Sequence, residues 1–331
     1  MTIAVFLGAL LGAMALGIPI SFSLLLCGVA LMWHLGSFDA QILAQNVITG
    51  ADSFPLLAVP FFMLAGEIMN AGGLSRRIVA FAMSLVGHVR GGLGYVAIVA
   101  AILMAALSGS AVADAAALAA LLLPMMKAAG HDKARSAGLL ASASIIAPII
   151  PPSIGFVIFG VAANVSISKL FLAGIFPGLM LGAALWVTWW WVARKENVTP
   201  PPRKTRAEVL AVLKDATFAL VLPVIVVVGL KMGVFTPTEA AVVAAVYALF
   251  VSTVVYRELK LSDLYDLFLA AAKTTAVIMF LVAAAMVSAW MITVAQLPDE
   301  IVGLLQPLLD KPMLLMMAIM VLVMSSAPPW T

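Results

Sequence analysis

The sequence has very little charge. Only 10% of its 331 residues are Asp, Glu, Lys or Arg, whereas 64% are hydrophobic and the mean hydropathy is +1.18. Soluble domains carry roughly 25% charged and about 45–50% apolar residues. Apolar runs long enough to cross a hydrocarbon layer of about 30 Å recur along the whole chain. The composition therefore excludes a soluble domain and predicts an all-α polytopic protein embedded in a lipid bilayer.

Residues for metal, redox and nucleotide chemistry are also scarce. Cys27 is the only cysteine, which excludes an intrachain disulfide and favours a packing thiol. No His, Cys or carboxylate cluster has metal-ligand spacing, so no cofactor is expected. No Gly-x-x-x-x-Gly-Lys-[Ser/Thr] run is present, so ATP hydrolysis by a P-loop is excluded. The sequence does not predict an enzyme.

An intramembrane hydrolase is the alternative from the enzyme class. A membrane serine protease needs a Gly-x-Ser-Gly run and a histidine at membrane depth. Ala106 stands where the first glycine of that run is needed, and none of the three histidines lies deep in an apolar run.

The net charge of +3 lies in short basic clusters between apolar runs. This distribution follows the positive-inside rule and gives no basic face for nucleic acid. The strongest cluster is residues 194–214, which we place in the cytoplasm together with Arg76–Arg90 and Lys127–Arg135. Working backwards, the helix Leu170–Val192 ends on the cytoplasmic side. Its four tryptophans are expected to form an interfacial belt: Trp186, Trp189, Trp190 and Trp191.

Residues 1–33 are apolar throughout and contain no Lys or Arg. This stretch is longer than the apolar core of a signal peptide, so it predicts a retained membrane helix. Gly17 and Pro19 are expected to kink that helix.

Two short apolar arms, Leu93–Leu107 and Ala111–Leu123, are joined by Ser108-Gly109-Ser110. Each arm is too short to span the bilayer comfortably, which predicts a re-entrant helical hairpin entering from the cytoplasm. Non-helical backbone at membrane depth is tolerated only where protein buries it or a wet cavity adjoins it. Asp114 lies about one turn beyond the tip, where a charged group costs roughly 2.5–3.5 kcal/mol. The hairpin tip is therefore a candidate site.

The following apolar stretch, Ala137–Ala163, is interrupted by prolines and flanked by hydroxyls. Its interruption contains Ser144, Pro148, Pro151, Pro152 and Ser153. Prolines at this spacing cannot continue a regular helix. A discontinuous helix beside a hairpin tip is how secondary transporters bind anions at helix N-termini and cations at freed oxygens. The alternative is a packing kink with small-residue helix contacts.

The order of elements repeats with opposite hand after residue 214. An apolar helix, Ala276–Ala295, an amphipathic segment, Asp299–Asp310, and an apolar arm, Met313–Met324, follow the order seen before the first hairpin. The second repeat stops before a return arm and is expected to be incomplete, which makes an inactive fragment or an assembly scaffold the alternative function. The predicted divisions are 1–53, a first repeat 54–193 with hairpin 92–126 and broken helix 137–165, a basic loop 194–214, and a truncated second repeat 215–331.

Several motifs together resemble one family. They are Ala51–Pro60, Gly66–Asn70, Gly72–Ser75, Ser108–Asp114, Pro148–Ser153 and Phe235–Ala240. In these motifs the sequence resembles the large permease subunit of tripartite ATP-independent periplasmic (TRAP) transporters, up to about Met324. Gln41–Gln45 and Thr188–Trp191 resemble the 2,3-diketo-L-gulonate type. The second hairpin and second broken helix usual in the family are missing.

The resemblance implies an elevator-type, inverted-repeat fold of the ion transporter superfamily in the bacterial inner membrane. It also implies sodium-coupled import of small organic anions, such as C4-dicarboxylates or sugar acids. The expected partners are a small membrane subunit and a periplasmic substrate-binding protein.

The resemblance also implies roles for single residues. Ser108, Gly109, Ser110 and Asp114 match the inner hairpin, while Ser144 and the segment Pro148–Ser153 match the first broken helix. Ser108, Ser110 and Ser153 are expected to coordinate sodium or substrate, and Asp114 to orient the tip. Ile145 and Ala147 replace an expected hydroxyl and glycine. Glu67 is expected to have a structural or subunit-interface role, and Glu239 to be a helix N-terminal charge.

Overall fold

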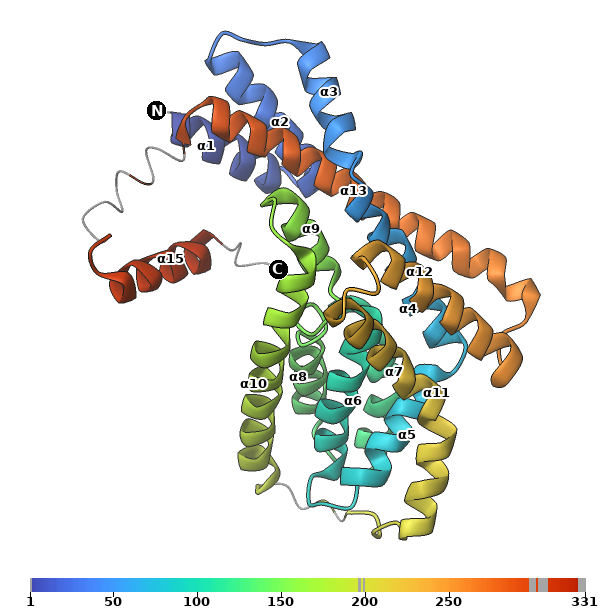
Figure 1. Ribbon diagram of the computed structural model, residues 1–331. Coiled ribbons are helices and arrows are strands. Elements are labelled where there is room, and N and C mark those ends of the chain that lie inside the picture. Colours follow the sequence, from blue (N-terminus) through green and yellow to red (C-terminus); the bar gives the residue numbers. More distant parts are fainter. Residues whose placement is uncertain (1, 196–197, 199, 298–301, 303–308, 327–331) are drawn as a thin grey trace. The chain divides into compact units, whose positions relative to one another are not determined.

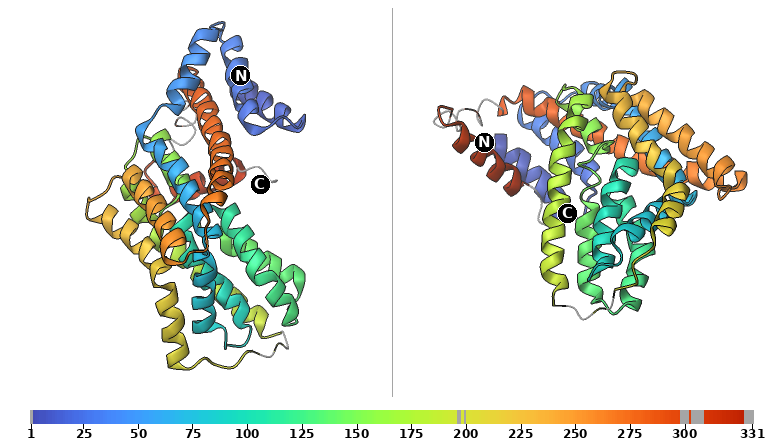
Figure 2. Two further views of the ribbon diagram at one scale, coloured as in Figure 1. Left: turned by 90° about the vertical axis from the view of Figure 1, so that its right-hand side faces the viewer. Right: turned by 60° about the horizontal axis from the view of Figure 1, so that its bottom comes forward.

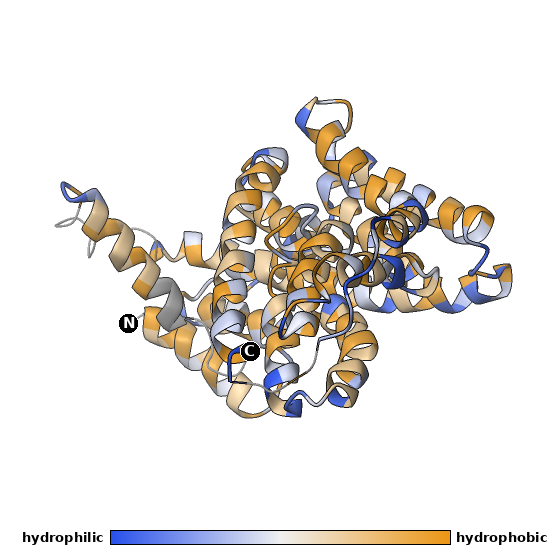
Figure 3. Cartoon of the chain, turned by 90° about the horizontal axis from the view of Figure 1, so that it is seen from below, coloured by the Kyte–Doolittle hydropathy of each residue, from blue (hydrophilic) through white to orange (hydrophobic). Residues whose placement is uncertain are grey.

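The computed structural model describes residues 2–195, 198, 200–297, 302 and 309–326 (Figure 1). Every regular element in that part of the chain is helical. Six helical segments there are long and apolar enough to cross a membrane, which confirms the polytopic all-α class: Phe54–Ala71, Ala111–Ala128, Ile167–Ala193, Arg206–Lys231, Pro237–Val255 and Leu261–Val294. Hydrophobic residues cover most of the helices, and hydrophilic residues gather at helix ends and connections (Figure 3).

The chain divides into two compact units, one made of Met1–Ala51 with Met279–Thr331 and the other of Asp52–Ile278. In the first unit, the predicted single kinked helix is wrong. The structure has two helices that pack against each other, α1 (Thr2–Ala15) and α2 (Ile20–His34). Gly17 adopts φ +78°, a left-handed conformation that glycine tolerates, and the chain leaves the α1 direction there. Pro19 then serves as the N-cap of α2.

The first unit also contains α3 (Ala40–Ala51), the C-terminal part of α13 (Leu264–Val294) and α15 (Pro312–Ser326). The Ser288 hydroxyl of α13 donates a 2.8 Å hydrogen bond to the Leu24 carbonyl of α2. Cys27 is fully buried and its thiol lies 3.5 Å from the Phe6 carbonyl, which confirms a packing thiol. The predicted amphipathic segment 299–310 falls mostly outside the described residues.

The second unit begins with a short 3₁₀ turn, Phe54–Leu57, followed by α4 (Ala58–Ala71) and α5 (Leu74–Val86). Next come α6 (Gly92–Ser108), α7 (Ala111–Ala128), α8 (Lys133–Ser144), α9 (Ile154–Ala162) and α10 (Ile167–Ala193). The contacts of α6 with α7, α8 and α10 place these four helices side by side, as Figures 1 and 2 show.

The second unit is completed by α11 (Arg206–Lys231), α12 (Pro237–Phe250) with a π-helical turn Val251–Val255, and the first half of α13. A capping box between Thr205 and Glu208 starts α11 inside the segment predicted as a loop, so that loop is shorter than expected. A matching box between Thr236 and Glu239 starts α12, which confirms the predicted helix N-terminal role of Glu239.

Charged residues join three helices of this unit near the start of α5. The Arg77 guanidinium lies 2.7 Å from the Glu258 carboxylate and 3.2 Å from that of Asp215. It also lies over the Tyr256 ring, whose hydroxyl donates to the Asp215 carbonyl. These contacts fix α5 against α11 and the end of α12.

The predicted tryptophan belt needs one correction. Trp189 is only 3% exposed, and its indole N–H donates a 2.8 Å hydrogen bond to the Gly91 carbonyl. Gly94 makes room for the indole, because a Cβ there would lie 2.0 Å from the ring. Trp190 and Trp191 are exposed, under the cations of Arg194 and Lys195. Trp189 therefore anchors α10 to the start of α6.

Candidate functional site

The predicted helical hairpin is present. Helix α6 ends at Ser108, Gly109 adopts φ +60° as its C-cap, and α7 begins at Ala111. One expectation was wrong, because α7 with its 18 residues is long and apolar enough to span a membrane. The break between the arms nevertheless lies where Ser108-Gly109-Ser110 predicted it.

The broken helix is present too. Helix α8 ends at Ser144 and α9 begins at Ile154, and the residues between them form turns and bends around the three prolines. The Pro151–Pro152 peptide bond is cis. The prolines therefore end one helix and leave a connection before the next, as predicted.

The hairpin tip touches the proline segment directly. A Cβ added to Gly109 would lie 2.3 Å from the Pro152 carbonyl oxygen and 3.2 Å from the Ser153 Cα. On the other side, Gly66 of α4 approaches Ser108, with 3.7 Å between a Cβ there and the Ser108 Cα. The structure thus brings together the two interrupted elements that the sequence identified separately.

Helix α10 closes the other face of the proline segment. A Cβ on Gly174 would lie 2.2 Å from the Ile149 carbonyl oxygen, and one on Gly178 would lie 2.4 Å from the Ile150 side chain. Both glycines allow the backbone of α10 to approach the unwound connection. The sequence analysis missed these glycines, although their i, i+4 spacing was a signal of close helix packing.

The serines of the site have local structural roles that the sequence analysis missed. Ser110 is the N-cap of α7 and accepts from the Ala113 N–H at 3.4 Å. Ser153 is the N-cap of α9, accepts from the Phe156 N–H and donates to the Pro148 carbonyl at 2.6 Å. The Ser144 hydroxyl donates to the Leu140 carbonyl. Serine directly before a helix is a readable N-cap signal.

Asp114 lies against the tip and holds Ser108. The Ser108 hydroxyl donates a 2.5 Å hydrogen bond to the Asp114 Oδ1 and accepts one from the Ser110 N–H. Asp114 is 1% exposed, and its Oδ2 has no hydrogen-bond partner among the described residues. A buried carboxylate oxygen without a partner is costly and calls for an explanation. This geometry agrees with an orienting role for Asp114 and leaves one acceptor unused.

The site presents both kinds of partial charge. Helix α7 begins two residues after Gly109 and α9 two residues after Pro152, and these two residues contact each other; each helix N-terminus carries partial positive charge. Hydroxyl, carbonyl and carboxylate oxygens from Ser108, Asp114 and Ser153 lie in the same elements. Such an arrangement suits an anion at the helix ends and a hard cation at the oxygens. Glu67 is half-buried on α4, next to Gly66.

Comparison with known proteins agrees with these features. Residues 7–327 match the family described as the tripartite ATP-independent periplasmic transporter, DctM component. The chain is 59% identical over 324 residues to the 2,3-diketo-L-gulonate TRAP transporter large permease protein YiaN of Escherichia coli, covering 98% of this chain and 76% of that protein.

Two further relatives have other names. The chain is 40% identical over 314 residues to the sialic acid TRAP transporter large permease protein SiaM of Vibrio cholerae, covering 95% of this chain and 74% of that protein. It is 41% identical over 263 residues to the C4-dicarboxylate TRAP transporter large permease protein DctM of Pseudomonas aeruginosa, covering 80% and 62%. The chain therefore belongs to the large permease family of TRAP transporters, which are membrane transport proteins and not enzymes.

Proposed function

We propose that this permease carries small organic anions across the inner membrane, driven by sodium, and that the α6–α7 tip and the α8–α9 connection form its sodium and substrate site. The observation that carries the proposal is the direct contact of Gly109 with Pro152 and Ser153, beside a buried Asp114 oxygen that has no hydrogen-bond partner in the described part of the chain. Two interrupted helices and an unused acceptor in one place are the features of a membrane ion site.

In this proposal, the oxygens of Ser108, Ser110 and Ser153 coordinate Na⁺, with backbone carbonyls of the interrupted segments. Asp114 keeps the Ser108 hydroxyl in position through their 2.5 Å hydrogen bond. The carboxylate of the substrate faces the N-termini of α7 and α9, because their dipoles favour negative charge. The hairpin and the broken helix move together across the bilayer, as the family resemblance implies.

The substrate class follows from the names of the relatives. Diketogulonate, sialic acid and C4-dicarboxylates, which those names give, all carry a carboxylate. We assign a sugar acid of the 2,3-diketo-L-gulonate type to this chain, because that relative shares 59% of aligned residues with it. We further assign it a small membrane subunit and a periplasmic binding protein as partners, since the family is tripartite.

Reconstituted transport tests the proposal. The chain is placed in proteoliposomes with the small subunit and binding protein, and uptake of labelled 2,3-diketo-L-gulonate is followed with an inward Na⁺ or K⁺ gradient. We expect uptake with Na⁺ alone and at least a tenfold loss in Ser108→Ala. The matched control is Ser166→Ala, because Ser166 is also a helix N-cap but belongs to neither the hairpin tip nor the proline segment.

Two results would overturn the proposal. Equal uptake with K⁺ would exclude sodium coupling. Absence of uptake, with binding protein and small subunit still assembled on the chain, would favour an assembly scaffold.

A further inference from the structure

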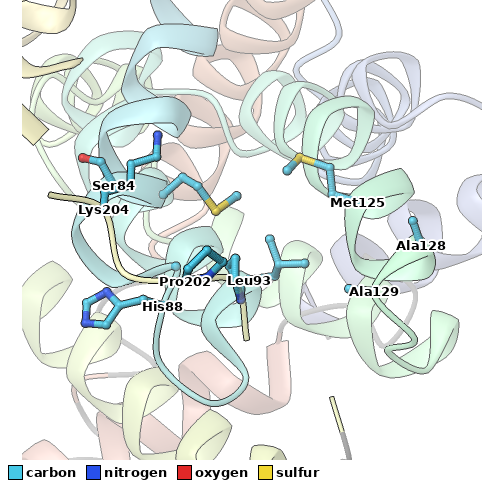
Figure 4. Close-up of a pocket in the computed structure, with 11 residues that line it drawn as sticks. Ser84, His88, Leu93, Met125, Ala128, Ala129, Pro202 and Lys204 are labelled. Carbon is cyan, nitrogen blue, oxygen red and sulfur yellow. The ribbon is translucent and has the colours of Figure 1, made fainter. Parts of the chain in front are cut away.

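Two adjoining cavities lie beside the C-terminal end of α5, where residues 200–206 pass α5 and α7 (Figure 4). Their volumes are about 550 Å³ and about 540 Å³, and they share Ser84, His88 and Lys204 as walls. None of their lining residues belongs to the hairpin tip or the proline segment. They therefore form a place for a ligand separate from the proposed transport site.

The two cavities differ in chemistry. The first is mainly apolar, and Figure 4 shows Met125 and Ala128 of α7, with Ala129 directly after that helix, across from His88 and Lys204. The second is lined by Arg203, Lys204 and Arg206 at the start of α11. Among the described residues, no carboxylate lines either cavity. The combined space is amphipathic, with a cationic end and an apolar end.

The cationic end forms no direct ion pair among the described residues. Within the part of the chain that the structure describes, the ion pairs join Arg76 and Arg77 to carboxylates, and none includes Arg203, Lys204 or Arg206. The nearby Glu208 carboxylate accepts from the backbone and hydroxyl of Thr205 and also attracts Lys204, so it balances only part of this positive charge. A group with negative charge would balance these cations.

His88 adds a polar group that points to the same ligand. Its Nδ1 is buried and has no hydrogen-bond partner among the described residues. A neutral imidazole carries one donor and one acceptor nitrogen, so it can donate to a phosphate oxygen. Because this nitrogen is inaccessible as the side chain stands, the imidazole has to rotate toward the cavities before a phosphate oxygen can accept from it.

We propose that the joined cavities bind one anionic phospholipid of the cytoplasmic leaflet. Its phosphate lies among Lys204, Arg203 and Arg206 and accepts from His88, while an acyl chain lies against Leu93 and Met125. The positive-inside rule places this end of the chain in the cytoplasm, at the depth of lipid headgroups. Basic pockets between membrane helices on that side suit anionic headgroups. A bound lipid would tie the start of α11 to α5 and α7.

Native mass spectrometry of the delipidated chain in detergent tests the proposal. Phosphatidylglycerol is titrated against phosphatidylcholine with the same acyl chains, and glycerol phosphate serves as the soluble probe. We expect preferential binding of phosphatidylglycerol, weakened about fivefold by each of Lys204→Gln and Arg206→Gln, since a cation near an anionic lipid contributes roughly that factor. Lys204→Arg should retain binding. Ala128→Trp, which fills the apolar cavity, should weaken both lipids.

The control variant is Lys214→Gln, which removes an exposed cation from the same helix outside both cavities. Phosphatidylglycerol binding reduced equally by Lys214→Gln and Lys204→Gln would mean non-specific attraction and overturn the proposal. Unchanged binding in Lys204→Gln and Arg206→Gln would overturn it as well. Displacement of the lipid by glycerol phosphate at equal concentration would identify a site for a soluble anion instead. The assay measures no transport, so its failure is separate from failure of the sodium site.

Discussion

The turn between α1 and α2 and the turn between α6 and α7 use the same backbone device. Gly17 and Gly109 both adopt positive φ, +78° and +60°, where one helix gives way to the next. A Cβ at Gly17 would meet nothing within 4 Å, whereas one at Gly109 would meet the Pro152 carbonyl at 2.3 Å. A glycine turn between apolar helices is therefore not a site by itself. The second turn differs because a broken helix encloses it.

The side chains at the two turns differ as well. The α1–α2 turn presents Leu16, 82% exposed, and Pro19, which caps α2 without a side-chain hydrogen bond. The α6–α7 turn has Ser110 as a hydrogen-bonding cap and a buried Ser108–Asp114 pair. The comparison teaches that enclosure and unused hydrogen-bonding capacity, taken together, distinguish a binding turn from a connecting one.

Alanine at each glycine should give the largest difference between the turns. A left-handed conformation costs a non-glycine residue roughly 1–2 kcal/mol, so Gly17→Ala should lower stability by about that amount. Gly109→Ala carries the same cost and also forces Pro152 away. We expect Gly109→Ala to lower the thermal midpoint more and to abolish uptake. Equal thermal midpoints and equal uptake for the two variants would contradict the proposed difference between the α1–α2 turn and the α6–α7 turn.

A double-mutant cycle should sharpen the account of Asp114. Ser108→Ala and Asp114→Ala should show a coupling free energy of up to about 3 kcal/mol, because the hydrogen bond between these residues is buried and a low local dielectric strengthens it. The control is the neutral pair Ser75 and Asn70, whose hydrogen bond is equally short and should couple by about 1 kcal/mol. Chemical unfolding in detergent measures both cycles. Additive effects of Ser108→Ala and Asp114→Ala would show that Asp114 does not position Ser108.

Variants of two serine N-caps should distinguish a structural role from a role in binding. Ser166→Ala should lower stability by about 1 kcal/mol, because it removes an N-cap. Ser153→Ala should lower it by more, because it also removes the hydrogen bond to the Pro148 carbonyl. Asparagine caps helices as well as serine does, so Ser153→Asn should recover the capping part of that loss. Uptake should be lost in both Ser153 variants and kept in Ser166→Ala. Full uptake by Ser153→Asn would show that Ser153 acts only as a helix N-cap and does not bind sodium or substrate.

The smallest effect is expected where Trp189 anchors α10 to the start of α6. Trp189→Phe removes the hydrogen bond to Gly91 and should lower stability by about 0.5–1.5 kcal/mol. Trp191→Phe should change stability by less, because Trp191 is 63% exposed. The thermal midpoints of the two purified variants provide the comparison. A larger loss in Trp191→Phe would contradict the anchoring role of Trp189.

The interruptions of the second unit could be predicted from sequence because their causes are local. Gly109 and the prolines at 148, 151 and 152 stop helices wherever they occur in such runs. The same reasoning failed at residues 1–33, because a glycine and a proline two residues apart predict a kink and a reversal equally well. Only the packing of α1 against α2 decides between them.

Contacts between segments that are distant in the chain could not be predicted from the sequence. The burial of Trp189 depends on Gly91 and Gly94, almost a hundred residues earlier. A tryptophan beside basic residues otherwise favours an interface. The contact of Gly109 with Pro152 likewise joins two elements whose proximity was inferred from their succession alone. The residue types of these two elements indicated interrupted helices, but only the structure shows that the elements contact each other.

Sodium-dependent labelling at the hairpin tip tests the central claim most directly. In a Cys27→Ser background, Val112→Cys is treated with a membrane-impermeant thiol reagent in vesicles, with Na⁺ or with K⁺; Val112 is an exposed residue of the first turn of α7 and is not a proposed ligand. Ser166→Cys, in an exposed helix cap, is the control. The account predicts that Val112→Cys reacts in K⁺ and is protected by Na⁺, while Ser166→Cys reacts equally in both. A tip that is sealed in both salts, or that reacts at the same rate in both, would contradict a sodium site there.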